Sequence, residues 1–359
     1  MRIAVLGGGH GCYAAAADFS EAGHEVRMWR RNAEALRELS ETRTICLRDF
    51  KGSRPVKIAV ATADIGEAVA GVDLIVAPTP AFAQPDIARK LAPHLTDGQV
   101  IFLPPGTFGS YLMMKVLRDN GCTAEIMIAE TGTLPWLTRK RGSGEIAITT
   151  RATRLPTGVF PARLTDKAIA VISKAFPDAI EPIEDALSGA LMNAGPIIHP
   201  PLIVMNAGPI EHFERWDIHK EGTQPTIRRV HDALDAERIA IRETLGYGAP
   251  HFPLSDHYNT SNWMYGNLAH DKLVDSGDWH EHLDLNTHRY MLEDVGLGLA
   301  FLVSVGEWSG VPCPVAAGLL AVSGAATGND FRRDGRTLAN LGLAGRSRAE
   351  IQTMLREGI

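Results

Sequence analysis

The residues best suited to chemistry near the start of the chain form a glycine-rich turn, Gly7-Gly8-Gly9-His10-Gly11-Cys12. Two registers of a dinucleotide-binding fingerprint fit this turn. One begins at Gly7 and has Cys12 in its third place, and the other begins at Gly9 and ends at Ala14. We prefer the first, because it directly follows the apolar residues 3–6. Glycine allows a tight turn and a close approach of the backbone to a pyrophosphate, which then lies at the N-terminus of the next helix. All six residues are therefore candidate cofactor contacts, and a glycine turn without a ligand is the alternative.

Two arginines, Arg30 and Arg31, follow the next apolar segment, where NAD-binding chains usually carry Asp or Glu to hold the ribose hydroxyl. A guanidinium pairs with a phosphate through its charge and its fork of donors. We therefore expect NADP as the preferred cofactor, with NAD as the alternative. Both arginines could instead be solvated surface residues.

Two later loops also follow apolar segments. Pro78 and Thr79 come after residues 72–77, and the segment 104–107 comes after residues 99–103. Ligands of open parallel sheets lie at the carboxyl ends of the strands, so Pro78 and Thr79 are further candidate cofactor contacts. Ordinary loop chemistry explains both segments equally well.

The elements that must position these residues alternate along the first half of the chain. Residues 3–6, 24–29, 57–61, 72–77, 99–103 and 125–129 have the pattern of strands, with helical segments between most of them. This alternation predicts an α/β fold with a Rossmann-type, doubly wound parallel sheet. From about residue 185 helical periodicity takes over. We expect a dinucleotide-binding domain at 1–182 and a mainly α-helical substrate and catalytic domain at 183–359.

Two segments of the second half carry groups suited to acid–base and carboxylate chemistry, 193–200 and 286–295. The first resembles the Asn-x-x-Pro-x-x-His-Pro element of the octopine/nopaline (opine) dehydrogenase family. The second is similar to that family's Asn-x-x-His-Arg-Tyr-x-x-Glu-Asp-Val element. Segments 130–132 and 235–238 look similar as well, so the resemblance spans nearly the whole chain.

The resemblance implies a reaction and three roles. In this family a reduced nicotinamide delivers hydride to an imine formed from a 2-oxo acid and an amino acid. His199 matches the family's catalytic histidine, Asp294 its partner aspartate, and Arg289 its substrate arginine. The residue types suit this chemistry, since imidazole exchanges protons near neutral pH, a carboxylate orients it, and a guanidinium can clamp a carboxylate. On a continuous α-helix, however, Arg289 and Asp294 would lie about 140° apart, and they would share one narrow face only if the helix began after Arg289.

Two other functions remain open at this stage. The chain could be an NADP-dependent reductase of a 2-oxo or 3-hydroxy acid that needs no amine, or a non-catalytic NADP-binding sensor. His199 could also be structural, Asp294 a charge at a helix N-terminus, and Arg289 a surface ion-pair residue. The segment 278–282, with His251, Asp256 and His257 nearby in sequence, has groups that bind zinc, but we expect a polar loop there and no metal.

Composition limits the partners. The 359 residues carry a formal net charge of -6, which argues against nucleic acid or an anionic membrane as partner. The four cysteines lie far apart without a CxxC pair, as expected for reduced thiols in a cytoplasmic protein. No apolar stretch is long enough to span a bilayer. The expected partners are small molecules, an amino acid and a 2-oxo acid, and a homodimer is compatible with the sequence without being fixed by it.

Overall fold

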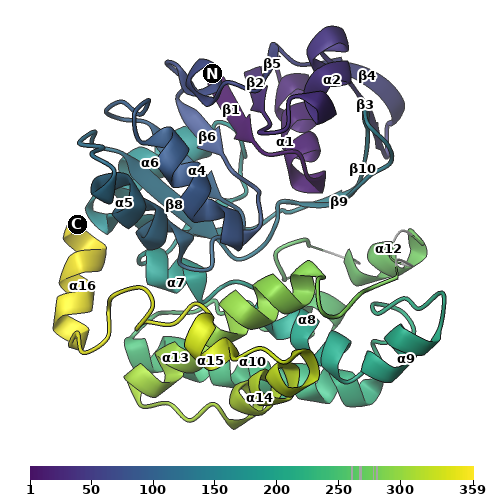
Figure 1. Cartoon of the computed structure of the whole chain (residues 1–359), viewed down its shortest axis with the longest axis vertical. Coiled ribbons are helices and arrows are strands. Elements are labelled where there is room, and N and C mark those ends of the chain that lie inside the picture. Colours follow the sequence, from purple (N-terminus) through teal and green to yellow (C-terminus); the bar gives the residue numbers. More distant parts are fainter. Residues whose placement is uncertain (260–261, 267–268, 278, 280–281) are drawn as a thin grey trace. The chain divides into compact units, whose positions relative to one another are not determined.

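The computed structural model describes residues 1–259, 262–266, 269–277, 279 and 282–359 (Figure 1). The chain divides into two compact units. The first consists of Met1–Ala190 and Gln352–Ile359, and the second of Leu191–Ile351. The expected boundary between functional domains, after residue 182, stays a prediction.

An eight-stranded sheet organises the first unit. Its strands follow the order β12 (Ile180–Pro182), β11 (Leu155–Phe160), β8 (Met127–Thr131), β7 (Val100–Leu103), β6 (Leu74–Val76), β1 (Arg2–Leu6), β2 (Glu25–Trp29) and β5 (Val60–Thr62). The pair β11–β8 is antiparallel, and the other neighbouring strands are parallel. The predicted Rossmann-type parallel sheet is therefore confirmed, with one antiparallel pairing near its edge.

The core of this unit explains its short apolar strands. Ile3, Ala4, Val5 and Leu6 of β1 are completely buried, because β1 lies inside the sheet and has helices near it. The connecting helices are α1 (His10–Glu21), α2 (Arg37–Thr42), α3 (Ile65–Val69), α4 (Gln84–Leu91), α5 (Gly109–Asp119), α6 (Thr165–Ile172) and α7 (Ala186–Ala190). The run of small residues 14–17 in α1 is also fully buried, which permits close packing of this helix.

A second sheet in the first unit was not predicted. It has the order β4 (Gly52–Lys57), β3 (Thr44–Asp49), β10 (Glu145–Arg151) and β9 (Trp136–Lys140). The expected strand at 57–61 was wrong, because β4 ends at Lys57 and β5 begins at Val60. Strands such as β4 expose most of their residues and therefore lack the apolar run that identifies a buried strand.

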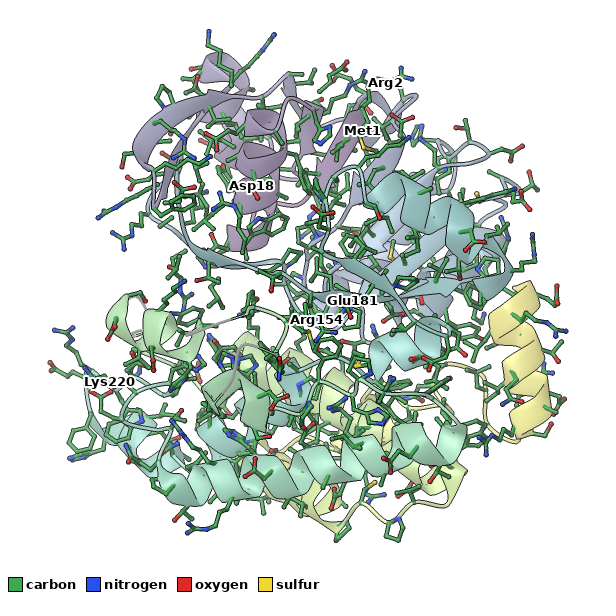
Figure 2. All side chains as sticks on the ribbon, turned by 180° about the vertical axis from the view of Figure 1, so that it is seen from behind. Met1, Arg2, Asp18, Arg154, Glu181 and Lys220 are labelled. Carbon is green, nitrogen blue, oxygen red and sulfur yellow. The ribbon has the colours of Figure 1, made fainter. Side chains whose placement is uncertain are left out.

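Ion pairs join this second sheet to α1. Asp18 of α1, labelled in Figure 2, accepts hydrogen bonds from Arg151 Nε and Nη2 at 2.9 and 2.7 Å. It also accepts one from Trp136 Nε1 at 2.8 Å. Arg151 donates in addition to Asp49 Oδ2 at 2.9 Å. These bonds hold β9 and β10 against the helix that begins at the glycine turn.

The second unit is helical, as expected. Its elements are α8 (Gly195–Val204), α9 (Ala207–His212), α10 (Pro225–Leu245), α11 (Ser255–Asn259), α12 (Ala269–Asp275), the π-helix η4 (Tyr290–Leu299), α13 (Ala300–Ser309), α14 (Pro314–Thr327), α15 (Phe331–Asp334) and the start of α16 (Arg348–Glu357). Within the described ranges, no helix is both long and apolar enough to cross a membrane.

Candidate active site

The glycine turn connects β1 to α1 and requires the absence of side chains. Gly7 has φ +119°, and a Cβ atom there would lie 2.7 Å from Cys12 Sγ and from Thr79 Cγ2. A Cβ at Gly11 would lie 3.1 Å from Pro78 Cβ. The structure therefore brings Pro78 and Thr79 against the turn, as their place after β6 predicted. Gly9, in contrast, has open space where a side chain would begin, so the backbone there is accessible to a ligand.

The start of α1 has the properties of an anion site. It is twelve residues long, has no acidic residue in its first turn, and is preceded by Gly9 without a side-chain cap. Its first N–H groups and its dipole favour a negatively charged group such as a pyrophosphate. The imidazole of His10 is held in place, because its Nδ1 accepts a hydrogen bond from the Lys140 backbone N–H at 2.8 Å.

Cys12 packs beneath the glycine turn, against the end of β1. Its thiol is completely buried and lies 3.4 Å from the Leu6 carbonyl oxygen, to which it donates. Burial raises the pKa of this thiol to about 12, so it stays protonated. A buried, protonated thiol packs and donates a weak hydrogen bond, which makes Cys12 a supporting residue of the turn.

The two arginines after β2 lie in different surroundings. A Cβ atom at Gly8 would lie 2.5 Å from Arg30 Nε, so Arg30 lies directly against the turn. Its Nη1 donates to the Ala35 carbonyl oxygen at 2.8 Å. Arg31 is 77% exposed and forms an ion pair with Asp86 Oδ2 at 3.4 Å. Of the two, Arg30 has the position to contact a cofactor.

The loop after β7 depends on a residue that the sequence had not identified as functional, Glu130. Its buried Oε2 accepts the Phe108 N–H at 2.7 Å, and its Oε1 accepts the Ser110 N–H at 3.2 Å and the Ser110 hydroxyl. Thr107 and Phe108 have positive φ, which these bonds stabilise. Glu130 thus fixes the loop at the carboxyl end of β7. The only signal for Glu130 in the sequence was that the segment 130–132 looks similar to a family element.

The second unit brings His199 and Asp294 together, although they are 95 residues apart. His199 Nδ1 lies 2.8 Å from Asp294 Oδ2 and donates to this carboxylate. Tyr290 stacks on the imidazole with ring centroids 3.8 Å apart. The bond to Asp294 fixes the ring orientation and leaves Nε2 as the nitrogen that can exchange a proton.

Small residues allow this pairing. A Cβ atom at Gly195 would overlap Asp294 Oδ1, and a Cβ at Gly298 would overlap Pro196. Asn193 Oδ1 accepts the Gly195 N–H at 3.0 Å, which orders the start of α8. The close packing of α8 on η4 therefore determines the distance between the imidazole and the carboxylate.

The angular problem posed by Arg289 and Asp294 does not arise in the structure, because the π-helix η4 begins at Tyr290 and Arg289 is its N-cap. The Ala300 N–H bonds to the Val295 carbonyl oxygen, a step of five residues. Side chains five apart in such a helix lie nearer to one face than they do in an α-helix. In agreement, the charge of Arg289 acts on both His199 and Asp294. Arg289 is exposed, lies 5.1 Å from the Tyr290 ring centroid, and pairs with no carboxylate in the described part of the chain.

Burial sets the protonation of this group. It lowers the pKa of His199 well below the ordinary value for histidine, and Arg289 lowers it further. It raises the pKa of Asp294, while Arg289 and His288 act in the opposite direction. His199 is therefore a neutral imidazole at neutral pH, with an unprotonated nitrogen available as a base.

A second histidine, His231, is hydrogen-bonded to the backbone of the segment 193–200. His231, on α10, is completely buried, and its Nε2 donates to the Ile198 carbonyl oxygen at 3.0 Å. Its Nδ1 lies 3.4 Å from the Tyr258 hydroxyl. The sequence did not identify His231, because the residues of its own helix do not indicate that its side chain bonds to a backbone carbonyl in another helix.

The zinc-like segment 278–282 can be assessed only in part. Residues 278, 280 and 281 lie outside the described residues. Among the residues that are described, no group of three or more His, Cys, Asp or Glu side chains could hold a metal ion.

Comparison with known proteins agrees with this arrangement. The family described as NAD/NADP octopine/nopaline dehydrogenase, alpha-helical domain, matches residues 182–327. The family described as NAD-dependent glycerol-3-phosphate dehydrogenase N-terminus matches residues 2–118.

Individual proteins extend the similarity over both units. An opine dehydrogenase of Arthrobacter sp. (strain 1C) is 30% identical over 98% of this chain and 97% of its own length. A vitopine synthase of Allorhizobium ampelinum is 24% identical over 96% of each chain. The solved structure of an octopine dehydrogenase with NADH and L-arginine is 18% identical, covers 98% of each chain, and has a TM-score of 0.73.

Proposed function

The chain belongs to the opine dehydrogenase family, and we propose that His199, Asp294 and Arg289 carry out its NAD(P)H-dependent reductive condensation of an amino acid with a 2-oxo acid. The 2.8 Å bond between His199 and Asp294 carries the proposal, because it joins the two elements that match the family into one acid–base group. The product is a secondary amine with two carboxylates, and one water molecule is released.

His199 serves as the proton-exchanging group. An amino acid reaches the site as an ammonium ion, and its nitrogen must lose a proton before it can attack a carbonyl carbon. Neutral Nε2 of His199 accepts this proton, and Asp294 stabilises the resulting imidazolium through Nδ1. The same imidazolium can return a proton to the oxygen that leaves as water.

Arg289 binds a carboxylate of the 2-oxo acid. Arg289 is exposed, and its charge acts on both His199 and Asp294. A bidentate pair with a carboxylate fixes both distance and orientation. The reacting carbonyl is thereby held near His199.

The residues of the glycine turn fit a nicotinamide cofactor, since they combine an open backbone at Gly9 with an acid-free helix N-terminus. A bound NAD(P)H supplies the hydride for the imine carbon. We propose that NADPH is preferred to NADH, because Arg30 lies at the turn where an acidic residue would otherwise bind the ribose. Pro78 and Thr79 border the same turn.

The test is an initial-rate screen of NADPH oxidation with 2-oxo acids, each measured with and without an amino acid. We expect turnover that requires both substrates. Equal rates without any amine would identify the chain as a reductase of a 2-oxo acid, and no turnover across the screen would favour a cofactor sensor. His199→Ala, assayed in parallel, shows whether the observed rate belongs to this site.

Assembly and location are separate proposals. We propose a homodimer, to be measured by light scattering at several protein concentrations. We also propose a cytoplasmic location, in keeping with four free cysteines. Fractionation of the source cells tests it, and recovery in a membrane or secreted fraction would contradict it.

A further inference from the structure

A second cation, Lys140, lies beside Arg30 at the glycine turn. It is the last residue of β9 and therefore comes from the sheet that the sequence did not predict. Its Nζ lies 3.9 Å from the centroid of the Tyr13 ring, in the first part of α1. Arg30 acts electrostatically on both Tyr13 and Lys140. Arg30, Tyr13 and Lys140 thus form one group, which we term the basic corner.

The position of Lys140 is fixed by the backbone. Its N–H donates to His10 Nδ1 at 2.8 Å, and its Cα pairs with that of Ile146 across the β9–β10 ladder. The ammonium group is therefore held over α1 by two elements, and its contact with the Tyr13 ring restricts the side chain further. Such restriction is unusual for an ordinary surface lysine, whose side chain is flexible.

The charges of the basic corner are only partly compensated. Neither Arg30 nor Lys140 forms an ion pair with a carboxylate among the described residues, and the charge of Glu38 acts on Lys140 less strongly than the charge of Arg30 does. Burial lowers the pKa of Lys140, and the charge of Arg30 lowers it further. The repulsion between the two cations exceeds the attraction of Glu38 for Lys140, so an anion placed between them would relieve the repulsion.

We infer that Lys140 and Arg30 together bind the 2′-phosphate of NADP(H). The inference rests on the proposed NADPH preference and adds a specificity-determining residue to it. Position supports this anion: Arg30 directly follows β2, where the adenosine ribose lies in this fold, and also contacts the turn at Gly8. The pyrophosphate, common to NAD and NADP, is the other anion that could approach the corner.

Binding of two small probes separates the two anions. Adenosine 2′,5′-bisphosphate carries the 2′-phosphate, whereas 5′-ADP carries only the pyrophosphate. Calorimetric titration of the full chain should show tighter binding of the first probe. We expect Lys140→Met to weaken its binding about tenfold, as for the loss of one charge-assisted hydrogen bond, and to change 5′-ADP binding less than about twofold.

Two further variants control the experiment. Arg141→Met removes the same charge from the neighbouring, exposed residue and should leave both affinities unchanged. Lys140→Arg keeps the charge and should retain most of the preference. Unaltered discrimination in Lys140→Met overturns the role of Lys140 alone. Equal binding of both probes by the unmodified chain overturns the NADPH preference as well, while the condensation reaction is unaffected by either result.

A measurement on the unmodified chain covers the case in which Lys140→Met fails to fold. Lysine acylation is followed by mass spectrometry in the presence of either probe. Protection of Lys140 by adenosine 2′,5′-bisphosphate, but not by 5′-ADP, is the expected result. Equal protection by both probes would assign Lys140 to the 5′-phosphate that they share, protection by 5′-ADP alone would assign it to the pyrophosphate, and no protection by either would remove it from the cofactor site.

Discussion

The glycine turn and the His199–Asp294 pair are built in opposite ways. The turn depends on the absence of side chains, because a Cβ atom at Gly7, Gly8 or Gly11 would lie too close to neighbouring atoms. The groups accessible to a ligand there belong to the backbone. The pair works through buried side chains whose protonation depends on their surroundings. A backbone site is encoded in adjacent residues. A side-chain site joins distant segments, and therefore depends on how two helices pack.

The largest effect should come from removing the imidazole. We predict that His199→Ala lowers kcat by about 10²–10⁴, the usual contribution of general acid–base catalysis, with NADPH affinity unchanged. Stopped-flow rates and fluorescence titration of NADPH measure the two quantities. Asp294→Asn should also lower kcat strongly, and the double variant should be little slower than His199→Ala, because both residues act as one unit. Fully multiplicative losses would show that they act separately.

The clamp on the oxo acid should contribute less. Arg289→Lys replaces a fork of donors by a point charge, so we predict an increase of roughly tenfold or more in the KM for the 2-oxo acid. NADPH affinity should not change. An altered affinity for NADPH with a normal KM for the oxo acid would place Arg289 at the cofactor instead.

The turn offers a comparison between adjacent residues. Arg30→Ala should reduce the preference for NADPH over NADH by about tenfold, the equivalent of one lost charge-assisted contact. Arg31→Ala should change it less than about twofold, because this exposed side chain pairs with Asp86. Ratios of kcat/KM for the two cofactors give the answer. A larger effect at Arg31 would reverse our assignment.

The smallest effect concerns stability. Burial raises the folded-state pKa of Asp294 above its unfolded value, so ionisation of this carboxyl opposes folding. The folded state is therefore favoured in acid, where the Asp294 carboxyl is protonated, and it loses this advantage as the pH rises through the pKa of the folded state. The Tm of Asp294→Asn, relative to the unmodified chain, should therefore rise by a few degrees between pH 5 and pH 8. A Tm difference that falls over this range would show that the ion pair with His199 outweighs burial.

The same contrast explains which parts could be predicted from the sequence. The turn at 7–12 and the strand before it are local, so residue types and order were sufficient. His199, Asp294 and Arg289 came from resemblance to a family. The sequence left open where the helix near Arg289 begins, and η4 is a π-helix that begins at Tyr290, so the angle of a continuous α-helix does not apply to Arg289 and Asp294. The second sheet, and with it Lys140, could not be recognised, because β4 exposes most of its residues and β3 pairs with β10, about a hundred residues away along the chain.

The most direct test of the reaction assigned to this chain is the mass of its product after turnover with NADPH that carries deuterium at the transferred position. With a 2-oxo acid and an amino acid, we predict one secondary amine that contains both carbon skeletons and one deuterium on the carbon that had been the carbonyl. His199→Ala should form it far more slowly. A deuterated 2-hydroxy acid as the sole product, with the amino acid recovered unchanged, would contradict reductive condensation.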